Sequence, residues 1–537
     1  MGWITNAKTR AQAFVAAEEA PVARWWLWFF AIVGAGTVLR FWNLGGAPIW
    51  MDEAVTLAFA RLDFGAILWE DIDNHPSLTW VIQRVWYLIN PDTSAARVPV
   101  AFFGSLSVAA LMLATRDILS ARAAIFVGLL FAFSTGHIYF SQDARMYPYV
   151  VFGLILAVWG ALGHVVHDAR RPAIYAALYI IGGGFAIYSH IIGLIAMALI
   201  GFSSLAGGLL SGQDEAARLR FMRAWLLRNV ILFVLTLPWL IAISGASGTF
   251  PGLADGIPLS LVHWYYRNVT GFPGLANLSL PFEAILYALA TLSIPIAWLS
   301  GRKGLALLLA GLIIAYPLVI MAMHLRQPIF GNRIFLPSII GVTLGAGYAL
   351  SRLKPIRAMT VTGALLAVAA FISSAYELAH RVKLEDFPGA YAFAEQNGFD
   401  AAPTLTCVHF QTAAAWEARR QGRILYARGS EVLHYKGPEY WQAARMGMSW
   451  LRAANAREID AALGGGWLIE GGLEAALSND DQVMFIRAFC PDGYEEKIEA
   501  RLAALGFRNS SEANIQGNAA DFVILEAPST RITLYAR

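Results

Sequence analysis

The stretch "PAIYAALYIIGGGFAIYSHIIGLIAMALIGFSSLAGGLLSGQ", Pro172–Gln213, decides the fold class of this chain. It contains no Asp, Glu, Lys or Arg. A membrane-spanning helix needs about 20 consecutive apolar residues, so the stretch is long enough for two spans. Tyr188-Ser189-His190 lies in its middle, and we predict that the chain turns there. The stretch therefore predicts a helical hairpin in a bilayer.

The rest of the chain repeats this pattern. Of its 537 residues, 57% are hydrophobic and 14% are charged, whereas a soluble domain carries about 25% charged residues. The first apolar run ends in Arg40-Phe41-Trp42 without a small-residue cleavage site, so it is predicted to remain as a helix. Residues 1–378 are predicted to form a polytopic α-helical membrane domain of about eleven spans. The uncharged windows are centred near residues 32, 106, 132, 156, 181, 201, 240, 292, 313, 343 and 367.

Lys and Arg residues set the predicted orientation. If the N-terminus lies inside, the inner segments carry about twice as many Lys and Arg residues as the outer segments before residue 379. Cytoplasmic loops are enriched in these residues. Eleven spans then place the C-terminus outside. The sequence predicts a cytoplasmic N-terminus and an extracytoplasmic C-terminal part.

Residues 379–537 differ in character from the spans. They hold 20 of the 37 acidic and 16 of the 40 basic residues, so this part is net acidic and the rest is net basic. Short apolar runs alternate with helical patterns, which predicts a soluble α/β domain. The predicted strands are "TLTCVHF", "RILYAR", "GGWLIEGG" and "DFVILEA", and the predicted helices are "TAAAWEARR", "PEYWQAARMGMSWLRAA" and "EEKIEARLAAL".

Two features of this domain leave alternatives open. Cys407 and Cys490 are the only cysteines, and outside the cytoplasm they fit either a disulfide or two buried thiols. The stretch "HYKGPEYW", His434–Trp441, fits a sugar-contacting loop, and it fits better a surface loop that leads into a helix. We expect the domain to shape acceptor access and not to carry the reaction.

Chemically active side chains gather at the predicted outer face. The first outer loop, residues 43–97, holds the acidic pair of "PIWMDEAVTLAF" (Pro48–Phe59). Three further polar stretches fall at other outer turns. Ionisable residues at membrane depth are costly and tend to mark a site. Such residues are Asp52, Glu53, His75, Asp143, Arg145, His190 and Arg333. An isolated loop carboxylate is usually only solvated, and it is the grouping that points to function.

Five stretches resemble, in order and spacing, the polyprenyl-phosphate-dependent membrane glycosyltransferases of the GT-C fold. They are "WMDEA", "NHPSL", "SQDARMY", "YSHIIG" and "FGNRIFLPSI". The similarity extends over roughly residues 25–350 and is greatest to the protein O-mannosyltransferase and aminoarabinose transferase branch. This chain has Val55 where aminoarabinose transferases carry an Arg, and His75-Pro76-Ser77 lacks a second proline. The Val55 departure argues against aminoarabinose as the substrate.

The resemblance implies transfer of a hexose or pentose from a polyprenyl-phosphate donor to a hydroxyl outside a bacterial inner membrane. It implies that Asp52 is the general base, and that the product has inverted stereochemistry. Glu53 is expected to orient neighbouring groups or to contact the acceptor. Asp143 is expected to share this catalytic work, and its alternative role is an ion pair with Arg145.

The departing phosphate needs cations, and Arg is suited to it because its planar fork donates two hydrogen bonds. The expected phosphate ligands are His75, Arg145, His190 and Arg333. Alternatively, His190 caps a helix and Arg333 reaches lipid headgroups. Tyr147 and Tyr188 are candidate acceptor contacts, although packing is the more ordinary role for Tyr147.

The sequence leaves open whether the protein uses a metal ion, and it allows two other functions. Asp52, Glu53 and Asp143 carry the hard oxygen ligands that divalent ions prefer, but we expect no obligatory metal. A transporter or flippase of a lipid-linked sugar is the main alternative, although it should show internal repeats and polar residues at the membrane midplane. An inactive scaffold whose tail recruits a partner is the other. The sugar and the acceptor stay open, with lipid A, cell-wall polysaccharide, surface glycan and protein all in view.

Overall fold

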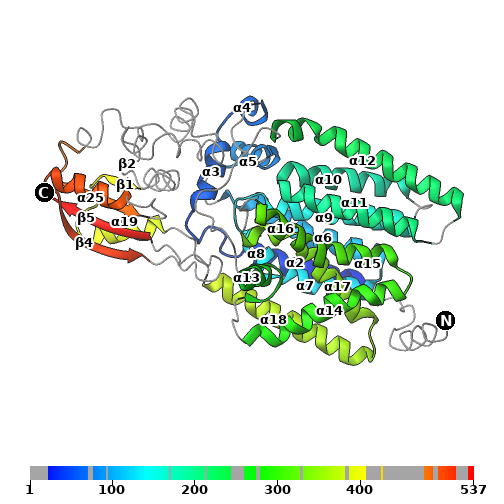
Figure 1. Cartoon of the computed structure of the whole chain (residues 1–537). Helices are drawn as coiled ribbons and strands as arrows, with labels where there is room; N and C mark the ends of the chain where they lie inside the picture. The colour runs from blue at the N-terminus through cyan, green and yellow to red at the C-terminus, as the bar shows by residue number, and fades with distance from the viewer. Residues whose placement is uncertain are drawn as a thin grey trace.

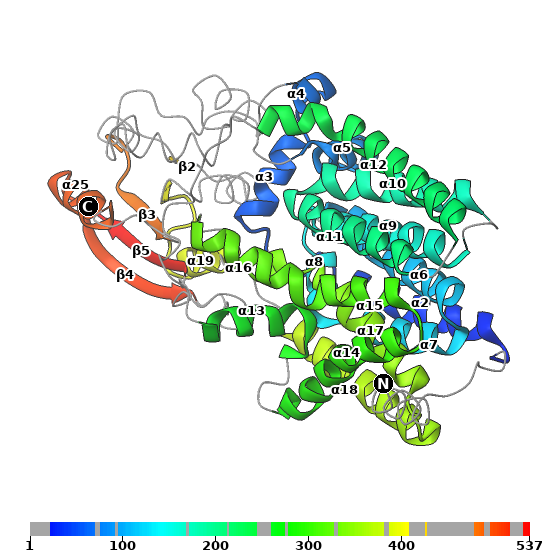
Figure 2. The same cartoon turned by 45° about the vertical axis from the view of Figure 1, so that its right-hand side comes forward.

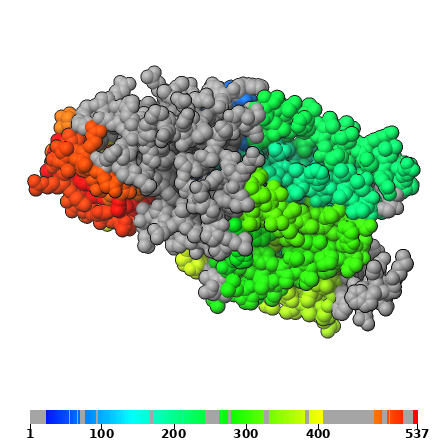
Figure 3. Space-filling model, in the orientation of Figure 1, coloured from blue at the N-terminus to red at the C-terminus, as the bar shows by residue number. Residues whose placement is uncertain are grey.

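The structure is a computed structural model of the whole chain. It describes residues 22–69, 76–91, 95–167, 171–211, 214–243, 259–273, 278–326, 331–380, 386–406, 425–426, 477–487, 494–515 and 530–537. A bundle of helices occupies one end of an elongated molecule, and a β-sheet, with two helices among its described residues, occupies the other (Figure 1). A space-filling view shows the same two ends, with the C-terminal strands in red and the bundle in green and cyan (Figure 3).

The helical bundle follows the apolar windows of the sequence. The helices that overlap these windows, some of them segments of a broken helix, are α2 (Trp25–Phe41), α6 (Val98–Ile118), α7 (Ala121–Ala132), α8 (Thr135–Ser141), α9 (Tyr147–His167), α10 (Pro172–Ser189), α11 (Ile191–Leu209), α12 (Glu215–Ile243), α14 (Leu280–Leu299), α15 (Lys303–Ala310), η3 (Gly311–Ala315), α16 (Tyr316–Arg326), α17 (Ser338–Arg352) and α18 (Ile356–Ala379). Further helices lie between them: α3 (Met51–Phe59), α4 (Phe64–Trp69), α5 (Leu78–Ile89), α13 (Leu259–Thr270) and η4 (Asn332–Phe335).

Each of the eleven predicted windows overlaps a helix or a broken helix of the described chain. Among the described residues, eight helices are long and apolar enough to cross a membrane, and the pair α7–α8, bent by 60°, makes nine if it is one span. The remaining two windows fall on α2, with 17 residues, and α17, with 15 residues. At 1.5 Å per residue, both are shorter than a full span. The chain is a multi-pass membrane protein.

The predicted hairpin is confirmed. Helix α10 ends at Ser189 and α11 begins at Ile191, so that one residue, His190, separates them. The backbone of His190 is extended, and its Nδ1 accepts a hydrogen bond from the backbone N–H of Ile192. The first N–H groups of a helix have no partner within the helix, which explains why a polar residue stands at this turn.

Helix α12 differs from the sequence expectation. The sequence places Arg218, Arg220, Arg223 and Arg228 in an inner loop before a span centred near residue 240. In the structure α12 begins at Glu215 and includes all four. Arg is a good helix former, so the charged segment continues the apolar helix. Arg228 is buried, with its guanidinium 5.1 Å from the ring centroid of Tyr179 on α10.

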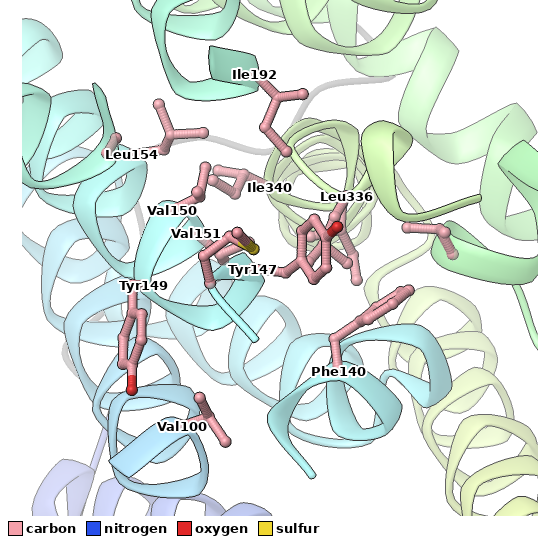
Figure 4. Close-up of a cluster of buried hydrophobic side chains, with 14 of the residues drawn as sticks. Val100, Phe140, Tyr147, Tyr149, Val150, Val151, Leu154, Ile192, Leu336 and Ile340 are labelled. Atoms are coloured by element: carbon pink, nitrogen blue, oxygen red, sulfur yellow. The ribbon is translucent and has the colours of Figure 1, made fainter. Parts of the chain in front are cut away.

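A hydrophobic core joins α8, α9, α11 and α17 beneath the end of the bundle that carries α3. Figure 4 shows Phe140, Tyr147, Ile192, Leu336 and Ile340 converging there from separate elements. The rings of Phe140 and Tyr147 lie 5.3 Å apart. Since Tyr147 is the first residue of α9, this packing fixes the end of the "SQDARMY" stretch.

The C-terminal part contains a five-stranded sheet in the order β2-β1-β3-β5-β4. Its strands are β1 (Thr404–Thr406), β2 (Leu425–Tyr426), β3 (Gln482–Arg487), β4 (Arg508–Ile515) and β5 (Thr530–Ala536), and its helices are α19 (Phe387–Gln396) and α25 (Tyr494–Ala504). Strand β1 runs parallel to β2 and β3, whereas β5 runs antiparallel to β3 and β4. In Figures 1 and 2 the sheet lies beyond the end of the bundle where α3 and α13 are found.

The sheet agrees with the sequence in some strands and not in others. β1 and β2 fall within predicted strands and α25 overlaps a predicted helix, whereas the sequence analysis predicts no strand at β3, β4 or β5. β4 reads "RNSSEANI" and is largely exposed at the sheet edge, so it has no apolar run to reveal it. The predicted "GGWLIEGG" and "DFVILEA" strands, Cys407, Cys490 and His434–Trp441 lie outside the described residues.

Candidate active site

The acidic pair lies in the first turn of α3. Its two neighbouring carboxylates have different surroundings: the Asp52 side chain is 13% exposed and that of Glu53 is completely buried. Successive residues of a helix point in directions about 100° apart, so adjacent acids can serve separate roles. The Asp52 carboxylate is partly accessible to solvent, and the Glu53 carboxylate points into the protein interior.

Asp52 meets two arginines from distant parts of the chain. Nη1 of Arg333, on η4, lies 2.7 Å from Oδ2 of Asp52 and donates a hydrogen bond to it. Nε of Arg145, just before α9, lies 3.6 Å from the same oxygen. One carboxylate oxygen is therefore contacted by two guanidinium groups. The structure thus brings together three of the predicted site residues.

The charges around Asp52 decide its protonation. Burial raises the pKa of the Asp52 carboxyl, and the guanidinium groups of Arg145 and Arg333 lower it by more, so the net shift is downward from 3.8. Glu53 opposes this as a like charge. Burial lowers the pKa of Arg333. The negative groups near it, Tyr147, Asp52 and Asp143, raise this pKa by more, so the net shift is upward. Asp52 is an anion and Arg333 a cation at neutral pH.

Arg145 is held from several sides. Its Nη1 donates to the backbone carbonyl of Asp52 and to Oγ1 of Thr56, at 3.2 and 3.4 Å. Its guanidinium lies 5.6 Å from the ring centroid of Trp80. Its buried Nε has no hydrogen-bond acceptor within the described part of the chain. A buried donor without an acceptor is costly, and an anion such as phosphate would satisfy it.

Glu53 and Arg97 form a buried pair that organises the loop. Nε and Nη2 of Arg97 donate to the two carboxylate oxygens of Glu53 at 2.6 and 2.7 Å. The backbone N–H of Ala144 donates to Oε1 of Glu53 at 2.9 Å. Arg97 also donates to the carbonyls of Leu44, Ala47 and Pro48. This fits the orienting role expected of Glu53, whereas its complete burial does not fit contact with an acceptor.

Asp143 is buried beside this pair. Nε1 of Trp50 donates to its Oδ1 at 2.8 Å. The acidic pair and the "SQDARMY" stretch are therefore joined by Trp50–Asp143, Glu53–Ala144 and Asp52–Arg145. These three links place the two stretches, far apart in sequence, in one site.

The other predicted residues differ in their relation to this site: Tyr147 contacts Arg333, and His190 packs against Tyr147. His190 caps α11 as described, and its ring packs 5.6 Å from that of Tyr147. Tyr147 lies under Arg333, whose guanidinium is 5.9 Å from the ring centroid. The hydroxyl of Tyr188 donates to the carbonyl of Leu235 on α12, which is a contact between helices. His75 lies outside the described residues.

Sequence reasoning missed the buried pair of Arg40 and His137, which adjoins the start of the "SQDARMY" stretch at Ser141. Arg40, fully buried at the end of α2, donates to the carbonyls of Phe131 and Ala132 at the α7–α8 bend. Its Nη2 lies 2.8 Å from Nδ1 of His137 on α8. Gln142 donates to carbonyls at the same end of α2. A lone Arg at the end of an apolar run was the only signal, and it reads equally well as a loop charge.

The carboxylates of the site are paired with side-chain N–H donors of the protein. Asp52 faces two guanidinium groups, Glu53 is bound by Arg97, and Asp143 accepts from Trp50. Across the described residues, no three His, Cys, Asp or Glu side chains are grouped to hold a metal ion. A divalent ion would have to compete with a guanidinium for Asp52 and Glu53, so these two acids fit a cationic side-chain site better than a metal site.

No protein-family model and no curated protein sequence matches the chain. Solved structures do. ArnT from Cupriavidus metallidurans bound to undecaprenyl phosphate is similar at 15% identity and a TM-score of 0.56, over 96% of this chain and 98% of that one. Its apo state gives 14% identity and a TM-score of 0.57, over 95% and 97%. AglB from Archaeoglobus fulgidus gives 12% identity and a TM-score of 0.47, over 86% and 69%. The chain thus has the polytopic GT-C fold of the ArnT structures.

Proposed function

We propose that this protein is a membrane glycosyltransferase that moves a sugar from a polyprenyl-phosphate donor to a hydroxyl of an extracytoplasmic acceptor. The observation that carries the proposal is the triad of Asp52, Arg145 and Arg333 at one site. It combines an ionised base with two cations suited to phosphate. The fold shared with ArnT, solved with undecaprenyl phosphate, supports a lipid-linked donor.

The chemistry assigns a role to each group. The acceptor hydroxyl attacks the anomeric carbon while Asp52 takes the hydroxyl proton. The bond between that carbon and the phosphate oxygen breaks, and its electron pair leaves on the phosphate. Arg145 and Arg333 stabilise the negative charge that develops there. A single displacement of this kind inverts the anomeric centre.

The arrangement supports a reaction without an obligatory metal. Arg145 and Arg333 supply the positive charge that a divalent ion supplies in other phosphate sites. Glu53, with both oxygens bound by Arg97, contributes by holding the loop in place. The proposed location is a bacterial inner membrane with the site on the outer side. The sugar is a hexose or pentose, and the acceptor is a glycan, glycolipid or protein.

The test is product release in a defined membrane. Purified protein in nanodiscs is incubated with undecaprenyl-phosphate-linked pentoses and hexoses and with lipid A, glycan or peptide acceptors. Formation of undecaprenyl phosphate and glycosylated acceptor, lost in Asp52→Asn, supports the proposal. Movement of intact donor between leaflets of vesicles, without cleavage, would instead show a flippase.

A further inference from the structure

Asp52 and the proposed phosphate ligands already bind each other in this structure. Oδ2 of Asp52 lies 2.7 Å from Nη1 of Arg333 and 3.6 Å from Nε of Arg145. A carboxylate held in this way by cations is a weak base, because the interactions that stabilise the anion are lost when it takes a proton. The proposed base therefore has to lose part of this interaction before it can act well.

The two arginines are held to different extents. Arg145 is 6% exposed and is fixed by the Asp52 carbonyl, Thr56 and the Trp80 ring. Arg333 is 36% exposed and touches Asp52 through one hydrogen bond, with its guanidinium over Tyr147. Arg333 is thus the cation that an incoming ligand can reach and turn.

We propose that the donor phosphate and Asp52 compete for Arg333, so that donor binding frees Asp52 to act as the base. This inference rests on the proposed function and adds the order of events. Without donor, Arg333 binds Asp52. With donor, the phosphate takes over Arg333, and Asp52 keeps its charge but loses its closest cation. The carboxylate then accepts the acceptor proton as the anomeric carbon–phosphate bond breaks.

Two facts make this competition effective. Phosphate offers several anionic oxygens to the guanidinium fork, and such charge-assisted pairs are strong. The buried Nε of Arg145, which has no hydrogen-bond acceptor within the described residues, lies 3.6 Å from the same Asp52 oxygen, so a phosphate that takes the place of this oxygen would face both arginines. The base is thereby strengthened only when a leaving group is in place.

A double-mutant cycle on binding tests the inference without any transfer reaction. The probe is undecaprenyl phosphate in nanodiscs, detected by native mass spectrometry, with undecaprenol as the lipid that lacks the phosphate. The variants are Asp52→Asn, Arg333→Gln and the double variant. Asp63→Asn, in the same outer loop, is the control that removes one negative charge elsewhere.

Competition predicts that Asp52→Asn binds undecaprenyl phosphate about 2- to 5-fold more tightly than wild type, as expected for release of one partly exposed ion pair. The gain should vanish in the Arg333→Gln background and be absent for undecaprenol and for Asp63→Asn. An unchanged affinity, or an equal gain in both backgrounds, overturns the inference but leaves the proposed function standing. If wild type binds undecaprenyl phosphate no better than undecaprenol, the phosphate site fails, and both proposals fail with it.

Discussion

Glu53 and Arg97, 44 residues apart, form a bidentate ion pair that is completely buried. The pair connects the start of α3 with the start of α6, and through Ala144 it reaches the "SQDARMY" stretch. Burying two charges costs several kcal/mol per ion unless geometry and further hydrogen bonds compensate. Here the carbonyls of Leu44, Ala47 and Pro48 accept the remaining Arg97 donors. The neighbour of the proposed base is therefore a structural anchor.

Replacing Glu53 by Gln should destabilise the fold by about 3–5 kcal/mol, because it leaves the Arg97 charge buried without a counter-ion. Thermal unfolding in detergent, followed by intrinsic fluorescence, measures this as a lower melting temperature. The double variant Glu53→Gln/Arg97→Met should recover part of the loss. The control is Glu395→Gln on the exposed side of α19. A single variant as stable as that control would contradict the anchoring role.

Replacing Asp52 by Asn should slow transfer roughly 10²–10⁴-fold, since the amide is nearly isosteric but does not take up the acceptor proton. Folding should be retained, because Asp52 is only one partner of a partly open ion pair. Initial rates of undecaprenyl phosphate release and the melting temperature are measured on the same preparation. Activity within a few-fold of wild type would rule out Asp52 as the base.

Both kcat/KM and kcat should fall at acidic pH, but at different pH values. The pKa of Asp52 is lowered in the free protein, so kcat/KM should fall only below the ordinary carboxyl value of 3.8. If phosphate takes over Arg333, the pKa of Asp52 rises in the complex and the limb of kcat lies at higher pH. The charged or titratable groups around this carboxylate are Arg145, Arg333, Glu53, Asp143 and Tyr147. A limb of kcat/KM above pH 5 would contradict the lowered pKa.

The same shift has a consequence for stability. Because the folded-state pKa of Asp52 is lower than the unfolded value, its ion pair stabilises the protein above the unfolded pKa. That stabilisation is lost as pH falls through the folded pKa. The wild type should therefore lose this stabilisation when the buffer is changed from neutral to acidic, whereas Asp52→Asn has none to lose. The drop in melting temperature between the two buffers should be smaller for Asp52→Asn than for the wild type.

Removal of divalent metal should leave transfer intact, since Arg145 and Arg333 provide the charge at the phosphate. The protein is dialysed against EDTA, its metal content is checked by mass spectrometry, and transfer is measured with and without added Mg²⁺ or Mn²⁺. An unchanged rate is expected. Loss of activity that either ion restores would show that the carboxylates rearrange around a metal.

The sequence by itself determined the membrane fold and the helical hairpin at His190. It also determined that the polar motifs gather in a few stretches. These properties are local: a run of about 20 apolar residues forms a helix in a bilayer whatever its neighbours are. That the protein is a multi-pass helical membrane protein could therefore be predicted from hydropathy alone. The motifs from Asp52 to Arg333 then indicated which side of the bundle carries the site.

Only the tertiary structure decided which partners these residues have. Glu53 follows Asp52 directly, yet Arg97 binds it in the interior while Asp52 meets Arg333, 281 residues away. Tyr188 lies two residues before His190 in sequence, but its hydroxyl donates a hydrogen bond to a carbonyl of α12. Arg40 looks like a loop charge until the α7–α8 bend brings two carbonyls to it. Such pairings depend on how helices pack and where a helix bends, and both follow from contacts between segments that are far apart in the chain.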